Sequence, residues 1–234
     1  MRVVFIGTSG GMPTANYGTS AIFVQLHGQK MLFDCGEGTQ QRMMKYGASI
    51  NIDSVFFSHM DADHTLGIPG LVQTCDMNNR NRYLDLYSTQ DSNGDLQRIV
   101  TGAYGMPRFD LKINGFKSGE RVVDSESFNI ESFNTDHDDV SAGYVIQESD
   151  RKGRINKEKL VNEYGLEPGS EYADLKNGQT VTLDDGTVID PDDVVGSARS
   201  GRKVVYTGDC RPNRETIEAS YDADLMIHDS TFSD

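Results

Sequence analysis

The chain has 234 residues, of which 36% are hydrophobic and 25% charged, and its formal net charge at pH 7 is −14. This length allows one large domain with a buried core, which excludes a disulfide-stapled miniprotein, and the composition excludes a disordered or fibrous chain. The acidic balance argues against broad electrostatic binding of nucleic acid. No apolar run approaches the roughly 18–20 residues that span a bilayer, and three cysteines far apart fit reduced thiols. We expect a cytoplasmic protein with no membrane partner.

The first 147 residues predict strands mixed with helices. Residues 2–6 predict a buried strand that ends in a glycine-rich loop, and the next two apolar runs flank a short turn and predict a hairpin. Glycine is spread between the runs instead of collecting in a linker, which indicates a single domain. In chain order we expect strands at 2–6, 20–26, 31–33, 54–57, 83–87, 121–123, 128–133 and 143–147, and helices at 39–45, near 71–75 and near 96–104.

Residues 149–202 differ in character from the rest of the chain. They are charged and glycine-rich, with little apolar periodicity, and we interpret them as an insertion with its own small structure. After the insertion, the pattern predicts a strand at 203–206, a helix at 213–219 and a strand at 225–227. We therefore expect one domain, residues 1–234, that carries this insertion.

The densest functional signal is the run Ser-His-Met-Asp-Ala-Asp-His at 58–64, directly after the strand at 54–57. Alternate positions of an extended loop can point His59 and Asp61 at one centre, while Asp63 and His64 face another. Neutral imidazole and carboxylate groups are ordinary ligands of Zn²⁺. The alternative is a polar turn that caps the next helix, with Asp63 as the N-cap residue. Two imidazoles and two carboxylates within six residues favour the metal site.

Other candidate ligands also follow predicted strands. His137 lies just beyond the strand at 128–133, Asp209 beyond the strand at 203–206, and His228 beyond the strand at 225–227. Segments that are far apart in sequence can converge where strands end, so we expect these side chains to share one site with the run 58–64. His27, the fifth histidine, is expected in a solvent-facing turn.

These segments, in this order, resemble the ribonuclease Z family of the metallo-β-lactamase superfamily. The whole superfamily shares the metal run, whereas Asp-Cys-Gly-Glu-Gly-Thr-Gln at 34–40 and Gly-Asp-x-Arg-Pro at 208–212 are much more specific to ribonuclease Z. The match also includes the segments 5–14, 67–71, 143–144 and 228–232, so it covers essentially the whole chain. The resemblance implies an α/β (α+β) protein with a four-layer αββα sandwich and an inserted flexible arm.

The resemblance also implies a site with two divalent metal ions, most naturally zinc. By position, His59 and His137 would bind one ion, Asp63 and His64 the other, and Asp209 would bridge them. The resemblance also implies two catalytic residues, Asp63 and His228. It implies that Asp34 and Asp229 orient ligands through hydrogen bonds. The implied enzyme is a metal-dependent endoribonuclease that hydrolyses one phosphodiester bond beyond the discriminator nucleotide of precursor tRNA, removing the 3′ trailer.

Asp61 departs from the family pattern His-x-His-x-Asp-His, because it stands where the second imidazole belongs. A carboxylate can still bind a metal ion, but it adds negative charge to a site that already holds other carboxylates. We therefore expect Asp61 to be a ligand and the metal preference to move from Zn²⁺ toward harder ions such as Mn²⁺.

Further departures concern the end of the chain and one loop. Family members continue past the 228–232 segment with a His-Ser-Thr loop and a last histidine, whereas this sequence stops at Asp234, so we expect a fragment of a longer protein; a truncated family member is the alternative. Asp229 stands where the family often has Glu, and Tyr17-Gly18 roughly where it has Arg-Asn.

The insertion begins with a basic stretch, residues 151–159, that contains five basic residues and one acidic residue. Similar segments in ribonuclease Z form an arm that grips the tRNA elbow, usually reaching the active site of the other subunit in a homodimer. The resemblance therefore implies precursor tRNA as partner, a homodimer, and RNA contacts by Arg151, Lys152, Arg154, Lys157 and Lys159. The alternative is a solvated charged protrusion.

Two other functions remain open on the sequence alone. One is a different metallo-β-lactamase-fold phosphodiesterase or hydrolase that acts on small esters with the same metal ions. The other is a non-catalytic RNA-binding paralogue, which the carboxylate at position 61 suggests. Metal analysis separates these classes, because the enzymes require metal ions and the paralogue does not.

Overall fold

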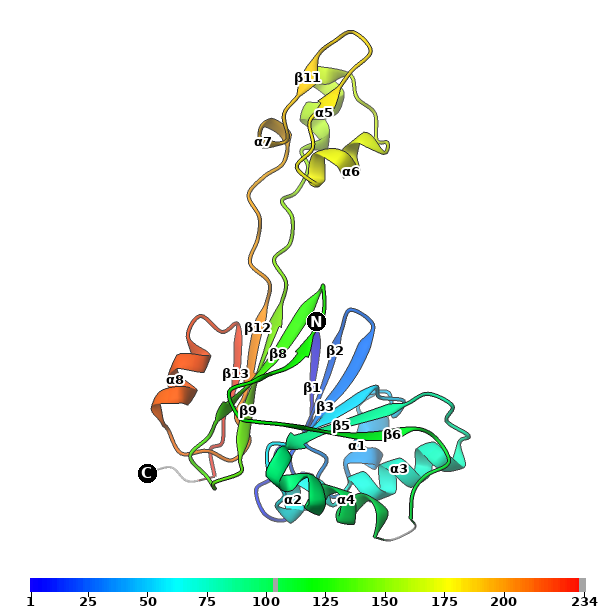
Figure 1. Ribbon diagram of the computed structural model, residues 1–234, viewed down its shortest axis with the longest axis vertical. Helices are drawn as coiled ribbons and strands as arrows, with labels where there is room; N and C mark the ends of the chain where they lie inside the picture. Colours follow the sequence, from blue (N-terminus) through cyan, green and yellow to red (C-terminus); the bar gives the residue numbers. More distant parts are fainter. Residues whose placement is uncertain (103–104, 232–234) are drawn as a thin grey trace. The chain divides into compact units, whose positions relative to one another are not determined.

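The computed structural model describes residues 1–102 and 105–231 and divides the chain into two compact units. The larger unit contains Met1–Gln147 and Arg202–Asp234, and the smaller unit contains Glu148–Gly201 (Figure 1). The smaller unit occupies nearly the same residues as the insertion expected from the sequence.

The first sheet of the larger unit has six strands in the order β1-β2-β3-β4-β5-β6. The first three strands form antiparallel pairs, and β3 to β6 pair in parallel. Parallel strands need crossover connections, and helices supply them here. The strands are β1 (Arg2–Gly7), β2 (Ala21–Leu26), β3 (Gln29–Phe33), β4 (Ser54–Phe56), β5 (Leu84–Thr89) and β6 (Leu111–Phe116).

The second sheet has five strands in the order β13-β12-β9-β8-β7. Strand β12 pairs antiparallel with β9 and parallel with β13, so the segments that follow the insertion return to the strand that precedes it. The strands are β7 (Arg121–Asp124), β8 (Phe128–Asn134), β9 (Ala142–Glu148), β12 (Lys203–Tyr206) and β13 (Leu225–Ile227).

A core of aromatic side chains lies between the two sheets. The rings of Phe33 and Phe56 stack with centroids 4.9 Å apart, and Tyr144 from the second sheet meets Phe56 edge-on at 5.6 Å. A second apolar cluster, which includes Leu32, packs the first sheet against its helices. These helices are α1 (Thr39–Lys45), α2 (Ala62–Thr65), α3 (Ile68–Met77), the short 3₁₀ turn η1 (Gln90–Ser92) and α4 (Asn93–Thr101). Helix α8 (Arg214–Ser220) packs on β8, which completes the αββα layers (Figure 1).

The smaller unit has an apolar core of its own. It contains α5 (Lys157–Tyr164), α6 (Glu171–Lys176), the two-stranded pair β10 (Val181–Thr182) and β11 (Val188–Ile189), and α7 (Pro191–Val194). Six residues from these elements are buried together: Leu160, Tyr172, Leu175, Val181, Ile189 and Val194. They come from five short elements, so no single element shows the periodicity by which a pattern predicts a core.

Strand β6 was not expected from the sequence. Its segment carries Asn114 and Gly115, which disfavour a strand, and its pairing with β5 decides the structure. A Cβ atom at Gly115 would lie 2.2 Å from the side-chain nitrogen of Asn93, so the glycine lets α4 pass close to this strand. The helix expected near 96–104 begins earlier, at Asn93, and ends at Thr101; residues 103 and 104 lie outside the described residues, as do 232–234.

Candidate metal centre

The run 58–64 leaves β4 and enters α2, and its backbone is fixed by the segment 34–38. The backbone N–H of Cys35 donates to the carbonyl of His64 at 2.8 Å. A Cβ atom at Gly36 would lie 2.1 Å from the carbonyl oxygen of Asp63, so only glycine allows this close approach. The segment 34–38 therefore holds the run 58–64 in place.

The structure does not have the helix cap that the alternative interpretation of this run required. Asp61, not Asp63, occupies the N-cap position of α2, and its side chain makes no capping hydrogen bond. Asp63 lies inside the first turn of the helix. The carboxylates of this run therefore have other partners than the helix N-terminus.

His59 and His64 are buried side by side, with ring centroids 4.1 Å apart. Nδ1 of His64 lies 2.7 Å from Oδ2 of Asp34, and Nδ1 of His59 lies 2.9 Å from Oγ of Ser58. In the neutral form of each ring, these contacts favour the tautomer with the proton on Nδ1 and the lone pair on Nε2. Both Nε2 atoms are buried and, among the described residues, make no well-aligned hydrogen bond, although carboxylate oxygens of Asp61 and Asp209 lie 3.5 and 3.1 Å from them. These two lone pairs could bind a metal ion. A buried nitrogen that binds neither a metal ion nor a hydrogen-bond partner destabilises the fold.

Asp34 organises these two imidazoles from beneath. Its carboxylate accepts hydrogen bonds from the backbone N–H and the hydroxyl of Ser58, both at 2.7 Å, from Nδ1 of His64, and from the hydroxyl of Tyr206. The side chain is fully buried. A carboxylate that orients imidazoles in this way fixes ring position and raises ligand basicity.

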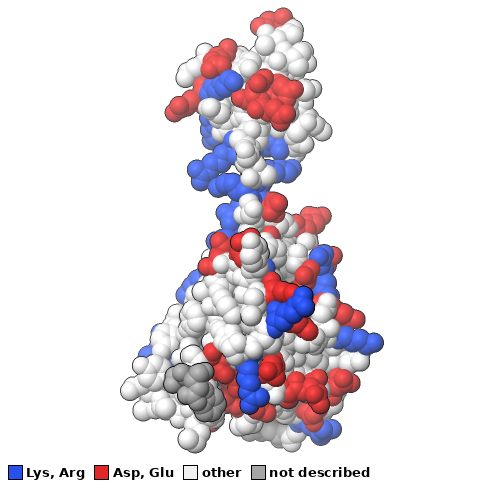
Figure 2. All heavy atoms as spheres, turned by 90° about the vertical axis from the view of Figure 1, so that its left-hand side faces the viewer, with Lys and Arg blue, Asp and Glu red and all other residues white. Residues whose placement is uncertain are grey.

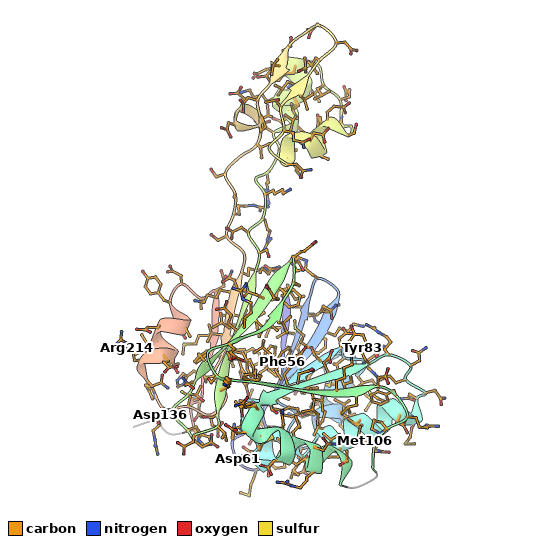
Figure 3. The ribbon with its side chains drawn as sticks, viewed as in Figure 1. Phe56, Asp61, Tyr83, Met106, Asp136 and Arg214 are labelled. Carbon is orange, nitrogen blue, oxygen red and sulfur yellow. The ribbon has the colours of Figure 1, made fainter. Side chains whose placement is uncertain are left out.

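Asp209 and His137 approach the imidazoles from the second sheet. Oδ1 of Asp209 lies 3.1 Å from Nε2 of His64, and the ring of His137 lies 4.6 Å from that of His59. Two groups of described residues bring possible ligand atoms within 4.8 Å of one another: His59, His64 and Asp209, and His59, Asp61 and His137. His59 belongs to both groups. Figure 3 labels Asp61 beside α2, and its Oδ2 lies 3.5 Å from His59 and 3.6 Å from His137.

Asp63 and His228 lie near these groups without belonging to them. Oδ2 of Asp63 accepts the backbone N–H of Gly11 at 2.8 Å and lies 3.5 Å from Nε2 of His64. His228 and Asp209 line a cavity of about 640 Å³, and Nδ1 of His228 contacts the carbonyl of Asp229 at 2.6 Å. The carboxylate of Asp229 accepts the N–H and hydroxyl of Thr231, so it orders its own turn.

The charges of the site shift its pKa values in opposite directions. Burial alone raises the pKa of Asp34, but His64 outweighs it and holds this pKa below its usual range. Burial alone lowers the pKa of His64, but Asp34 and Asp209 raise it to about 10. Burial and the neighbouring His64 lower the pKa of His59. A cation at Nε2 of His64 would replace a proton there, so metal binding weakens as the pH falls.

Ser58 and Tyr206 were not singled out from the sequence. Ser58 simply precedes His59 in the run. Val204 and Tyr206 alternate along β12 and both join the core between the sheets. A tyrosine hydroxyl that faces a core needs a buried acceptor. This requirement could have predicted from the sequence that Tyr206 donates to a buried polar group.

Comparison with known proteins decides the family. Ribonuclease Z of Natronomonas pharaonis is 45% identical to this chain over 233 residues, which cover 100% of the chain and 75% of that protein. Ribonuclease Z of Archaeoglobus fulgidus is 42% identical over 237 residues, with 100% and 76% covered. The chain belongs to the ribonuclease Z family. This membership confirms the resemblance inferred from the segments 34–40 and 208–212. Residues 1–148 also match the family model described as anti-Pycsar protein Apyc1.

Solved structures confirm the fold class. The short form of human tRNase Z (ELAC1) aligns with a TM-score of 0.68 at 21% identity, covering 99% of this chain and 79% of that chain. The metallo-β-lactamase fold protein YhfI from Bacillus subtilis aligns with a TM-score of 0.63 at 20% identity, covering 96% of this chain and 68% of that chain.

The ribonuclease Z family and the donor set at the two ligand groups together indicate divalent metal ions. In the described part of the chain, no helix has the length and apolar character to cross a membrane.

Proposed function

We propose that this chain is a metal-dependent endoribonuclease that removes the 3′ trailer from precursor tRNA by phosphodiester hydrolysis. The observation that carries this proposal is the convergence of the buried Nε2 atoms of His59 and His64 with the carboxylate of Asp209, within 4.8 Å of one another, in a chain of the ribonuclease Z family. Divalent ions held by these residues would supply Lewis-acid activation of water and stabilisation of the attacking and leaving oxygens.

The chain's own residues hold and orient this site. We propose His59, Asp61 and His137 as ligands of one ion, and His64, Asp63 and Asp209 as ligands of the other. Asp34 keeps Nε2 of His64 directed at the site, because it accepts the Nδ1 proton. His228 lies in the wall of the adjoining cavity. With Nδ1 donating to the carbonyl of Asp229, Nε2 is the nitrogen that can exchange a proton with substrate.

Cleavage of a precursor tRNA with a 3′ trailer tests this proposal. We expect trailer release that stops when a chelator is added and returns with excess divalent metal. Cleavage of bis-(p-nitrophenyl) phosphate without cleavage of precursor tRNA would favour the small-ester hydrolase instead. Binding of precursor tRNA by metal-free chain, with no cleavage of either substrate, would favour the RNA-binding paralogue.

Asp61 makes the metal preference testable. Its carboxylate is 61% exposed and lies next to both His59 and His137, where it adds a hard oxygen donor and a negative charge. We expect Asp61→His to shift the ratio of the Zn²⁺ and Mn²⁺ affinities toward Zn²⁺ by about 10-fold. Competition with a chelating dye measures both affinities, and Asp61→Asn, which keeps the shape and removes the charge, should weaken Mn²⁺ binding. An unchanged ratio in Asp61→His means that Asp61 is not a ligand.

The smaller unit supplies cations for the RNA backbone. Figure 2 shows Lys and Arg side chains gathered at the end of this unit where its two chain ends run together. Three of the five candidates are engaged within the unit: Arg151 pairs with the buried Glu148 at 3.0 Å, Lys152 donates to Asn177, and Lys159 donates to the carbonyl of Asp193. Arg154 and Lys157 are exposed and, among the described residues, make no side-chain hydrogen bond or ion pair.

Arg154 and Lys157 are therefore the strongest candidates for phosphate contacts. We expect Arg154→Gln with Lys157→Gln to weaken precursor-tRNA binding and to reduce the slope of log affinity against log salt by about 2, one for each phosphate that is no longer neutralised. Filter binding across a salt series measures both quantities. The double variant Lys112→Gln with Lys117→Gln removes the same charge from the larger unit and should bind normally. Equal affinity and slope in the arm variant at moderate salt would contradict the assignment.

The homodimer and the cytoplasmic location stay predictions from the sequence. Sedimentation of the chain, whose mass is 25.9 kDa, should give twice that mass if the homodimer forms.

A further inference from the structure

The loop between β1 and β2 reaches one of the proposed metal ligands. The carbonyl of Gly18 accepts the backbone N–H groups of Thr8 and Ser9, both at 2.9 Å, and so closes the loop at its base. From within the loop, the backbone N–H of Gly11 donates to Oδ2 of Asp63 at 2.8 Å. The carboxylate orientation of Asp63 therefore depends on where this loop lies.

Arg42 on α1 connects the two sides of the loop. Its Nε donates to the carbonyl of Ile6 at 3.0 Å, and its guanidinium also donates to the carbonyl of Asn16. The β1–β2 register shifts between Phe5 and Gly7, so Ile6 has no partner residue on β2. A bulge leaves a backbone group without its ladder partner, and Arg42 supplies a donor to this one.

Gly18 provides the space through which Arg42 passes. A Cβ atom at Gly18 would lie 2.4 Å from Cδ and 2.8 Å from Nε of Arg42. The backbone of Gly18 is not among the positive-φ glycines, so its conformation does not require glycine. The side chain of Arg42 thus occupies the space that a side chain at position 18 would need.

We propose that Arg42 is a positioning residue for the metal centre: through the loop 8–18, it holds the Gly11 N–H that orients Asp63, and Gly18 admits it. The inference rests on the proposed function, because it takes Asp63 as a metal ligand. Groups that orient a ligand through hydrogen bonds contribute about 10–100-fold to metal affinity, which sets the expected size of the effect.

Zinc titration against a chelating dye, with unfolding temperature recorded for every variant, tests the proposal. We expect Arg42→Met and Gly18→Ala each to lower zinc affinity at the weaker site by about 10-fold. The double variant should be no weaker than Arg42→Met alone, because the methionine has already removed the hydrogen bonds to Ile6 and Asn16 that alanine at position 18 would break. Arg42→Lys, which can still reach one carbonyl, should recover part of the affinity. Lys45→Met removes the same charge from the same helix and should bind zinc like the parent chain.

Two results would overturn the proposal: unchanged zinc affinity in Arg42→Met and Gly18→Ala, or losses that add in the double variant. If Arg42→Met does not fold, Gly18→Ala and Arg42→Lys carry the test. Asp63→Asn separates this inference from the proposed function. If Asp63→Asn loses zinc affinity while Arg42→Met and Gly18→Ala keep it, only the role of Arg42 is overturned. If Asp63→Asn binds zinc normally, Asp63 is not a ligand.

Discussion

Asp209→Asn should reduce precursor-tRNA cleavage by more than about 100-fold, because substitutions one step removed from a metal ion already cost 10–100-fold. The amide keeps the shape of the side chain but loses the charge that faces Nε2 of His64 at 3.1 Å. Asp209 is 30% exposed and no part of the aromatic core, so the fold should tolerate the change. Single-turnover cleavage and the metal content of the same sample are the measurements.

The control for this variant is Asp95→Asn, on the exposed surface of α4, where the carboxylate pairs only with Arg98 among the described residues. It removes the same charge from a position outside both ligand groups and should leave cleavage and metal content unchanged. A fall in rate with full metal content in Asp209→Asn would assign Asp209 to substrate contact and not to metal binding. A normal rate would remove it from the site.

Asp34→Ala should have the largest effect on stability. It leaves the hydroxyls of Ser58 and Tyr206 and Nδ1 of His64 without an acceptor in a fully buried position. Removing one partner of a buried ion pair costs about 3–5 kcal/mol, because the other charge stays buried and uncompensated. Urea unfolding followed by far-ultraviolet circular dichroism measures the loss as a lower midpoint at constant slope. Zinc affinity should fall with it, by about 10–100-fold.

The variant Asp53→Ala is the control that separates the loss of stability expected for Asp34→Ala from its loss of zinc affinity. Asp53 is also buried, accepts the backbone N–H of Lys30 at 2.8 Å and pairs with Arg82, but it lies outside both ligand groups. It should therefore lower stability without lowering zinc affinity. If Asp34→Ala and Asp53→Ala changed zinc affinity equally, the proposed role of Asp34 in orienting His64 would be wrong.

Local pattern predicted much of this fold. The apolar runs that form β1 to β4 are bounded by glycine and polar turns, and each was expected within two residues of its observed limits. The pattern could not predict β6, because its strand character comes from pairing with β5 and its glycine from contact with α4. The elements of the smaller unit were also beyond reach, since residues such as Leu160 and Ile189 form one core only in three dimensions.

The site was predictable as a set of residues but not as an arrangement. The run 58–64 indicated candidate metal ligands by density alone, whereas the approach of His137 and Asp209 was expected because they follow strands and match the family pattern. The sequence grouped His59 with His137 and His64 with Asp63. In the structure, His59 also groups with His64 and Asp209, and Asp63 accepts a hydrogen bond from Gly11. No local pattern contains these contacts, because a glycine-rich loop and two different sheets make them.

The most direct test of this account is the metal content of the chain. After equilibrium dialysis against Zn²⁺ or Mn²⁺ at neutral pH, elemental analysis should find about two equivalents per chain, as expected of a two-metal hydrolytic site. His59 is a proposed ligand of one of the two ions, so His59→Ala should lose about one of the two equivalents. A parent chain that retains no divalent metal would contradict the claim that these side chains form a metal centre, and with it the proposed hydrolysis.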